Sequence, residues 1–221
     1  YPITIDPLIA PAVFTYESGQ AEADMGVAVD FGDFNGDTTL DMVIGAPGYA
    51  FGGTTMGAVF VFYGGNSGFP ATYDVALSGD QTAYATFGEA LAVGDFDGDG
   101  FDDVAVGAPG MFNAKGRVYL YRGVGMGLGS TYDEVVSGAN VAGDEFGTAL
   151  AAVGNVLGDF RTDLLASAEH RDIGGNTDVG EVYLFQGKAA GLVSYDWVTV
   201  GTTAFDIFGH SLAGGYDIDG D

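Results

Sequence analysis

Short runs in which apolar residues alternate with small or polar ones recur along the chain and predict β-strands. The clearest are GAVFVFYGG from Gly57, GRVYLYRG from Gly116 and GEVYLFQG from Gly180. A second set follows them, with ATYDVALSG from Ala71, STYDEVVSG from Ser130 and VSYDWVTVG from Val193. Alternation rich in Val, Tyr and Phe is typical of strands. Because no segment shows a period of 3.6, we expect minimal helix.

These runs belong to a longer repeat. MGVAVDFGDFNGDTTLDMVIGAPG begins at Met25, FGEALAVGDFDGDGFDDVAVGAPG at Phe87, FGTALAAVGNVLGDFRTDLLASAEH at Phe146 and FGHSLAGGYDIDGD at Phe208, at spacings of 62, 59 and 62 residues. A fixed period of this size is typical of repeat architectures. We therefore divide the chain into repeats 25–86, 87–145, 146–207 and a partial fourth repeat, 208–221.

Each complete repeat contains four short strands, which predicts an all-β fold built of β-propeller blades. The expectation is a single β-propeller domain over 1–221, with about three and a half four-stranded antiparallel blades. The stretch 12–24 resembles a fourth strand and its loop, so we expect it to complete the last blade and close the ring in a longer protein. Phe87, Phe146 and Phe208 are expected to fill the space between blades, and the Gly after each allows close backbone approach.

The loops between the first two strands of each repeat are rich in carboxylates. The second loop offers Asp95, Asp97, Asp99 and Asp103 with the carbonyl of Phe101, and the first offers Asp33, Asn35, Asp37 and Asp41 with the carbonyl of Thr39. Alternating oxygens on a tightly curled loop are the ligands that Ca²⁺ requires. An EF-hand would need a Glu at position twelve and flanking helices, but Ile44 and Val106 stand there within strand-like runs. A solvated acidic turn without metal is the alternative.

The other two loops differ. The third has Asn155, Leu157, Asp159 and Asp163 with Arg161 at position seven, so we expect weak or no Ca²⁺ binding, because Leu157 cannot ligate and the guanidinium partly replaces the cation. The fourth begins with Asp217, Asp219 and Asp221, which we also count as metal ligands.

The composition of the chain disfavours some classes of partner and indicates how the fold is held together. The formal net charge is −25, with 6 Lys or Arg against 31 Asp or Glu, which disfavours nucleic acid and anionic membrane surfaces. Gly accounts for 39 of 221 residues, as expected of many tight turns. No apolar run is long enough to span a bilayer, and with no Cys the fold is held by packing or metal.

The combination of Phe-Gly or Met-Gly, an Asp-rich loop and Gly-Ala-Pro resembles the FG-GAP repeat of integrin α-subunit heads and of many microbial secreted proteins. The resemblance covers residues 12–221, although the third repeat replaces Gly-Ala-Pro with SAE at 167–169. It implies a ring of seven blades, Ca²⁺ in the hairpin between strands one and two, and partner binding on the opposite face. The absence of Cys and of an inserted domain favours a microbial member over an animal integrin.

Few residues suit catalysis. GHSLAG at 209–214 mimics a nucleophile elbow, but Ser211 occupies the repeat position of Ala90 and Ala149. His170 and His210 are the only histidines, and we interpret each as an ordinary loop or strand residue. The protein is therefore not expected to be an enzyme.

The functional hypothesis is a calcium-binding, extracellular or cell-surface propeller that acts in adhesion or assembly. The variable loops 48–56, 110–115 and 169–179 would contact a protein or glycan ligand through residues such as Tyr49, Phe51, Met111 and Phe112, and self-assembly is a further option. Two alternatives stay open: an accessory propeller of a larger secreted enzyme, such as a phospholipase or a polysaccharide-degrading enzyme, and a structural subunit of a surface layer or filament.

Overall fold

Three four-stranded antiparallel sheets account for most of the strands in the part of the chain that the structure describes. The structure, a computed structural model, describes residues 16–66, 68–192 and 194–215. The first sheet contains β1 (Val29–Gly32), β2 (Asp41–Ala46), β5 (Ala58–Phe62) and β6 (Val75–Leu77). The second contains β7 (Leu91–Gly94), β8 (Asp103–Ala108), β9 (Arg117–Tyr121) and β10 (Glu134–Val136). The third contains β11 (Leu150–Ala152), β12 (Leu164–Ala168), β13 (Glu181–Phe185) and β14 (Tyr195–Val200).

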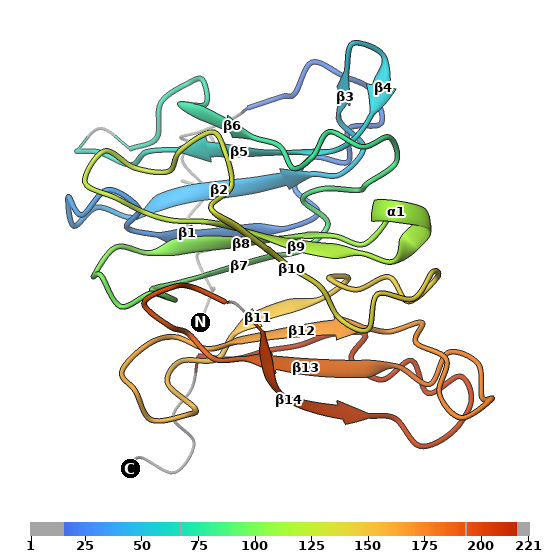
Figure 1. The fold of residues 1–221 in the computed structure, drawn as a ribbon. Helices are drawn as coiled ribbons and strands as arrows, with labels where there is room; N and C mark the ends of the chain where they lie inside the picture. Colours follow the sequence, from blue (N-terminus) through green and yellow to red (C-terminus); the bar gives the residue numbers. More distant parts are fainter. Residues whose placement is uncertain (1–15, 67, 193, 216–221) are drawn as a thin grey trace, which may run out of the picture.

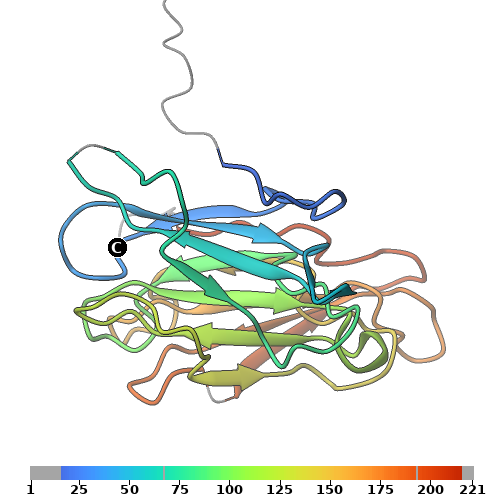
Figure 2. The same cartoon turned by 90° about the horizontal axis from the view of Figure 1, so that it is seen from above.

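Within each sheet the strands pair in chain order, as in a propeller blade. The sheets are stacked in sequence order in both views (Figures 1 and 2), and the first strands β1, β7 and β11 contact one another in turn. This arrangement confirms the all-β, four-stranded-blade architecture predicted from the repeats. Each sheet is called a blade below.

Helix is confined to one turn among the described residues, as expected. This is α1 (Met111–Ala114), where Phe112 and Asn113 have φ of +52° and +62°. A small hairpin, β3 (Ala50–Phe51) with β4 (Thr54–Thr55), forms the corresponding loop of the first blade. No helix among these residues has the length and apolar character to cross a bilayer.

The hydrophobic core lies between the blades. Phe87 and Phe146 are 2% and 1% exposed, and their rings meet Tyr119 and Tyr183 with centroids 5.5 and 5.3 Å apart. The expectation for these two Phe residues is confirmed. Phe208 is 39% exposed, contrary to prediction, because no strand of a fourth blade is present among the described residues to cover it.

The glycines of the repeat allow neighbouring blades to touch through their backbones. A Cβ on Gly45 would lie 2.1 Å from the carbonyl oxygen of Gly88, and one on Gly107 would lie 2.1 Å from that of Gly147. The Gly of Gly-Ala-Pro in one blade therefore meets the Gly of Phe-Gly in the next. In the third blade Ser167 replaces this Gly, is fully buried and donates its hydroxyl to the Ala149 carbonyl.

The predicted closing strand lies partly outside the described residues. Residues 16–24 form turns and no strand, and residues 12–15 are not described. Tyr16 packs its ring against Phe62 of β5, with centroids 5.1 Å apart. The closure of the ring stays a prediction.

Candidate functional site

The three acidic loops lie at the same end of the blades. Each links the first strand of a blade to the second, and α1, which follows β8, marks the opposite end (Figure 1). In the first two blades a Gly–Asp pair closes the loop, with Gly32 opposite Asp41 and Gly94 opposite Asp103. The acidic loop therefore joins two antiparallel strands, as predicted, and is unlike the helix-flanked EF-hand.

Asp95 organises the second loop through hydrogen bonds to backbone N–H groups. Its Oδ1 accepts from Gly98 at 2.6 Å and from Asp99 at 3.1 Å, and its Oδ2 accepts from Gly100 at 3.0 Å. Asp97 and Asp99 in turn accept from the N–H groups of Asp99 and Phe101 at 3.1 and 2.9 Å. As a result, carboxylate oxygens of Asp95, Asp97 and Asp99 lie within 4.8 Å of one another.

The first loop repeats this geometry. Asp33 Oδ1 accepts from Gly36 and Asp37 at 2.7 and 3.1 Å, and its Oδ2 accepts from Thr38 at 2.8 Å. Asn35 accepts from Asp37 at 2.9 Å, and Asp37 accepts from Thr39 at 2.8 Å. The structure thus places Asp33, Asn35, Asp37 and Thr39 in one curled loop.

The last carboxylate of each loop is buried at its base. Asp41, Asp103 and Asp163 are 0% exposed. Both oxygens of Asp103 accept backbone N–H groups, from Phe96 and Gly123 at 3.0 Å each. Burial raises the pKa of Asp103 to about 8 and also raises that of Asp41. Asp163 accepts the equivalent backbone hydrogen bonds, although its loop lacks a full set of metal ligands. The last Asp of each loop therefore joins the loop to its blade in all three repeats.

The second loop fits a hard divalent cation. Its side-chain donors are carboxylate oxygens, and burial followed by the charge of Asp99 raises the pKa of Asp97. One guanidinium, that of Arg122, approaches Asp97 Oδ2 at 3.5 Å and compensates only part of the charge. A bound Ca²⁺ ion, which takes oxygen ligands, would relieve the repulsion between these carboxylates and favour their ionised form.

The guanidinium of Arg161, in the third loop, contacts the second loop as well as its own. Arg161 Nη1 lies 3.3 Å from Asp159 Oδ2 in its own loop, but Nε donates to the Asp97 carbonyl of the second loop at 2.9 Å. Leu157 is 42% exposed and supplies no ligand. The prediction of weak or no Ca²⁺ binding here is untested. The candidate ligands Asp217, Asp219 and Asp221 of the fourth loop lie outside the described residues.

Sequence reasoning missed the contacts between adjacent loops. Phe101 of the second loop lies over Gly36 of the first, where a Cβ would be 2.5 Å from Phe101 Cε1. Arg161 lies in the same way over Gly98, where a Cβ would be 2.9 Å from Arg161 Nε. The seventh residue of one loop therefore covers the fourth residue of the preceding loop. The glycine at the fourth position leaves room for this contact and is the sequence feature that could have indicated it.

The other candidate residues are dispersed. Ser211 is exposed and lies in a bend, with no helix after it among the described residues. Tyr49 packs on Phe51 and Phe60, with ring centroids 5.0 and 5.2 Å apart, so it serves its own blade. The two histidines lie close to the same carboxylate, which their interpretation as unremarkable residues did not anticipate.

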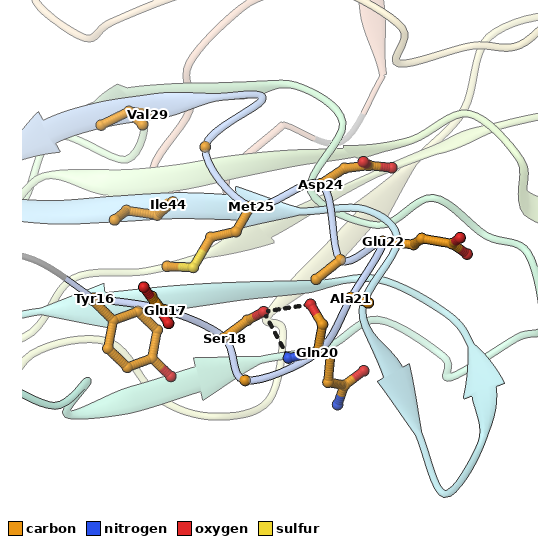
Figure 3. A pocket seen from close by; sticks show the side chains of 13 residues that line it. Tyr16, Glu17, Ser18, Gln20, Ala21, Glu22, Asp24, Met25, Val29 and Ile44 are labelled. Atoms are coloured by element: carbon orange, nitrogen blue, oxygen red, sulfur yellow. Dashed lines mark hydrogen bonds between the residues drawn. The ribbon is translucent and has the colours of Figure 1, made fainter.

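A hollow on the first blade is lined mainly by the segment Tyr16–Gly26 (Figure 3). Met25 and Ile44 supply apolar atoms, whereas Glu22 and Asp24 supply carboxylates. Ser18 exchanges hydrogen bonds of 3.2 Å with the backbone of Gln20 within it. The lining offers no Lys, Arg or His, and we assign it no role.

Comparisons with known proteins match both the repeats and the chain as a whole. The model of the FG-GAP repeat matches residues 25–62 and 87–121. Phosphatidylinositol-glycan-specific phospholipase D of Mus musculus is 34% identical over 209 residues, covering 87% of this chain and 25% of that protein. Integrin alpha-5 of Xenopus laevis is 31% identical over 218 residues, covering 92% of this chain and 19% of that protein.

The chain thus spans about a quarter or less of the length of these curated relatives. Among solved structures, rhamnogalacturonan lyase YesW superposes with a TM-score of 0.42 at 13% identity, covering 81% of this chain and 35% of that protein. At that score the superposition carries no argument about function.

Proposed function

The chain is an FG-GAP repeat protein, and we propose that it is a non-enzymatic, extracellular propeller module that Ca²⁺ stabilises and that mediates adhesion or assembly. The observation that carries the calcium proposal is the gathering of Asp95, Asp97 and Asp99, whose oxygens lie within 4.8 Å of one another. The first loop, with Asp33, Asn35, Asp37 and Thr39, would hold a second ion. Bound Ca²⁺ would neutralise the crowded carboxylates and stiffen the hairpins.

The expected gain in stability follows from mass action. An ion that binds only the folded state adds about 2.7 kcal/mol per site at 100 times its Kd. For a domain of this size that corresponds to roughly 5–11 °C in melting temperature per site. Chelation should therefore lower the melting temperature by several degrees.

The test compares equivalent positions in two loops. Asp99→Ala removes a ligand of the second loop, whereas Asp159→Ala changes the same position of the third loop. We expect Asp99→Ala to reduce the number of bound Ca²⁺ ions by one and to shrink the stabilisation by Ca²⁺, and Asp159→Ala to leave the ion count unchanged. Calorimetric titration and melts in Ca²⁺ or EGTA measure both. An identical melt in EGTA, with no metal in the purified protein, would overturn the calcium proposal.

The surface that we propose for adhesion is the end of the blades opposite the acidic loops. Around α1, Tyr84 and Phe112 are 75% and 45% exposed, and the Arg117 guanidinium lies 5.0 Å from the centre of the Phe112 ring. Exposed aromatic residues beside Arg are frequent at interfaces. Replacing Phe112 with Ala should weaken attachment of cells or glycans to the immobilised protein, whereas Phe160→Ala, at a Phe of the third acidic loop that is 95% exposed, should not. Equal attachment by all three proteins would exclude this surface.

The phospholipase relatives favour a second candidate function. Since the matched part is about a quarter of those proteins, this chain could serve as the accessory propeller of a larger secreted enzyme. The coding sequence on either side of residues 1–221 separates the candidates: a catalytic domain there supports the accessory role, and further repeats alone support the adhesion module. A structural role in a surface layer would appear as regular contacts between copies in electron micrographs.

A further inference from the structure

The two histidines of the chain lie close to a single carboxylate. His170 Nε2 is 3.7 Å from Glu169 Oε1, and His210 Nδ1 is 2.5 Å from Glu169 Oε2. They are the only histidines in the sequence and stand 40 residues apart. Glu169 is 6% exposed, so its carboxylate is fixed in the blade, whereas both imidazoles reach solvent.

Glu145 adds a second carboxylate. Its Oε2 lies 3.7 Å from His170 Nε2, and ligand atoms of Glu145, Glu169 and His170 are all within 4.8 Å of one another. None of the described ion pairs joins Lys or Arg to Glu145 or Glu169. The negative charge of this cluster is therefore not balanced by a permanent cation.

The cluster arises where the third repeat departs from its neighbours. Glu169 and His170 follow β12 directly and occupy the positions of Pro109 and Gly110 in the second repeat. His210 follows the Phe-Gly pair of the fourth repeat, where the third has Thr148. The five residues of β12 separate this cluster from the acidic hairpins by roughly 16 Å, so the two groups are distinct.

His170 is oriented as a metal ligand is. Its Nδ1 lies 3.2 Å from Asp178 Oδ1, so Nδ1–H can donate to that carboxylate and leave the lone pair of Nε2 directed at Glu145 and Glu169. Metal-ligating His residues almost always donate their second ring N–H to a carboxylate, carbonyl or water in this way. This bond supports metal binding independently of the clustering of the ligands.

The donor set and spacings point to zinc. Bonds of about 2.0–2.2 Å in a tetrahedron place neighbouring ligand atoms roughly 3.3–3.6 Å apart, close to the 3.7 Å separations of His170 Nε2 from the two carboxylates. Imidazole nitrogen suits Zn²⁺ and other first-row transition metals, whereas Ca²⁺ takes oxygen ligands. We propose that Glu145, Glu169 and His170 form a Zn²⁺ site, with Asp178 positioning the imidazole of His170 and His210 bonded to the other oxygen of Glu169.

The experiment titrates ZnCl₂ into the full-length protein in saturating Ca²⁺, followed by calorimetry. The result does not depend on the calcium proposal, because the His variant leaves the acidic hairpins unchanged and only the difference from wild type is measured. We expect wild-type protein to bind one Zn²⁺ more than the His170→Gln/His210→Gln variant. Asp178→Asn should weaken that ion by about 10–100-fold while leaving the stoichiometry intact.

The controls address folding and charge. His170→Gln is the single variant, because it removes the proposed imidazole ligand alone and its side chain is 36% exposed. Glu22→Gln removes one exposed acidic group outside the cluster and should not change Zn²⁺ affinity. Equal Zn²⁺ binding by wild type and both His variants, or displacement of this ion by Ca²⁺, would overturn the proposal and leave the cluster as a set of histidine–carboxylate ion pairs.

Discussion

Asp102 and Asp33 are joined by a reciprocal pair of hydrogen bonds across the boundary between the first two blades. The Asp102 N–H donates to the Asp33 carbonyl at 3.0 Å, and the Asp33 N–H donates to Asp102 Oδ2 at 2.9 Å. At the next boundary the Thr162 N–H donates to the Asp95 carbonyl at 2.9 Å. Each acidic loop is therefore tied to the next through its first ligand residue.

Replacing Asp102 with Thr, the residue at the equivalent place in the third blade, should lower the free energy of unfolding by about 1 kcal/mol. The Asp33 N–H would lose a charged acceptor in a half-buried position. The Ca²⁺ affinity of the first loop should fall as well. Urea unfolding and calcium titration measure these effects. Asp102→Asn keeps an acceptor oxygen and should lose less; a loss equal to that of Asp102→Thr would rule out the hydrogen bond as the cause.

Gly36→Ala should destabilise the protein more than Gly100→Ala. Both glycines have positive φ, +75° and +91°, so each Ala carries a backbone cost of about 1–2 kcal/mol. Only at Gly36 would the new Cβ also overlap a neighbour, the ring of Phe101, which adds roughly 1–3 kcal/mol. In a double-mutant cycle, adding Phe101→Ala to Gly36→Ala should remove the part of the destabilisation that comes from this overlap. Absence of coupling between the two positions would show that the ring does not set the difference.

Phe146→Ala should cost about 3–5 kcal/mol of stability, because the ring is 1% exposed and fills the space between the second and third blades. Phe205 is 69% exposed, and Phe205→Ala should stay within about 0.5 kcal/mol. Thermal melts in saturating Ca²⁺ compare the two. Similar losses would contradict the assignment of the core to the blade interfaces.

In chelator, stability should fall as the pH rises from about 4 to about 8. Burial raises the pKa of Asp103 to about 8, whereas in the unfolded chain an Asp titrates near 4. Between these values the folded state keeps a proton that the unfolded state has released, so the free energy of unfolding decreases by up to about 1.4 kcal/mol per pH unit. The fall ends above pH 8, where both states are ionised.

Melting temperatures across this range measure the effect. Ca²⁺ should reduce this loss of stability with pH, since it favours ionised carboxylates. Asp103→Asn should remove the part of the loss that comes from Asp103. Asp206 should make the protein less stable as the pH falls below about 4, because hydrogen bonds from Thr203 and Thr202 lower its pKa to about 2. A melting temperature in EGTA that rises from pH 5 to 8 would contradict the role of the buried carboxylates.

The blades could be predicted because strand alternation, turn glycines and the repeat all indicate the same structure. Phe87 and Phe146 show this well, since each stands at the same point of its repeat and both are buried. Phe208 has the same local sequence but is 39% exposed. Its burial depends on a neighbouring blade, which local sequence does not specify.

The curled shape of the acidic loops could be predicted from the spacing of their carboxylates, but the surroundings of these loops could not. Nothing in the spacing of Asp95, Asp97 and Asp99 indicates that Arg161, more than 60 residues later, donates to the backbone of Asp97. The pairing of His170 and His210 with Glu169 was missed for the same reason. Their sequence positions become neighbours only when the third blade meets the start of the fourth repeat.

The overlap of Phe101 on Gly36 and of Arg161 on Gly98 has a consequence for how such proteins can change length. Inserting or deleting a residue in one hairpin would displace the side chain that covers the adjacent hairpin, so neither could vary alone. At the far end, Thr55 of β4 accepts a hydrogen bond from the Tyr84 N–H at 2.7 Å, but the tip of the β3–β4 hairpin is open, since a Cβ on Gly52 or Gly53 would have no neighbour within 4 Å. Engineered peptides should therefore be accepted there and rejected among the acidic hairpins.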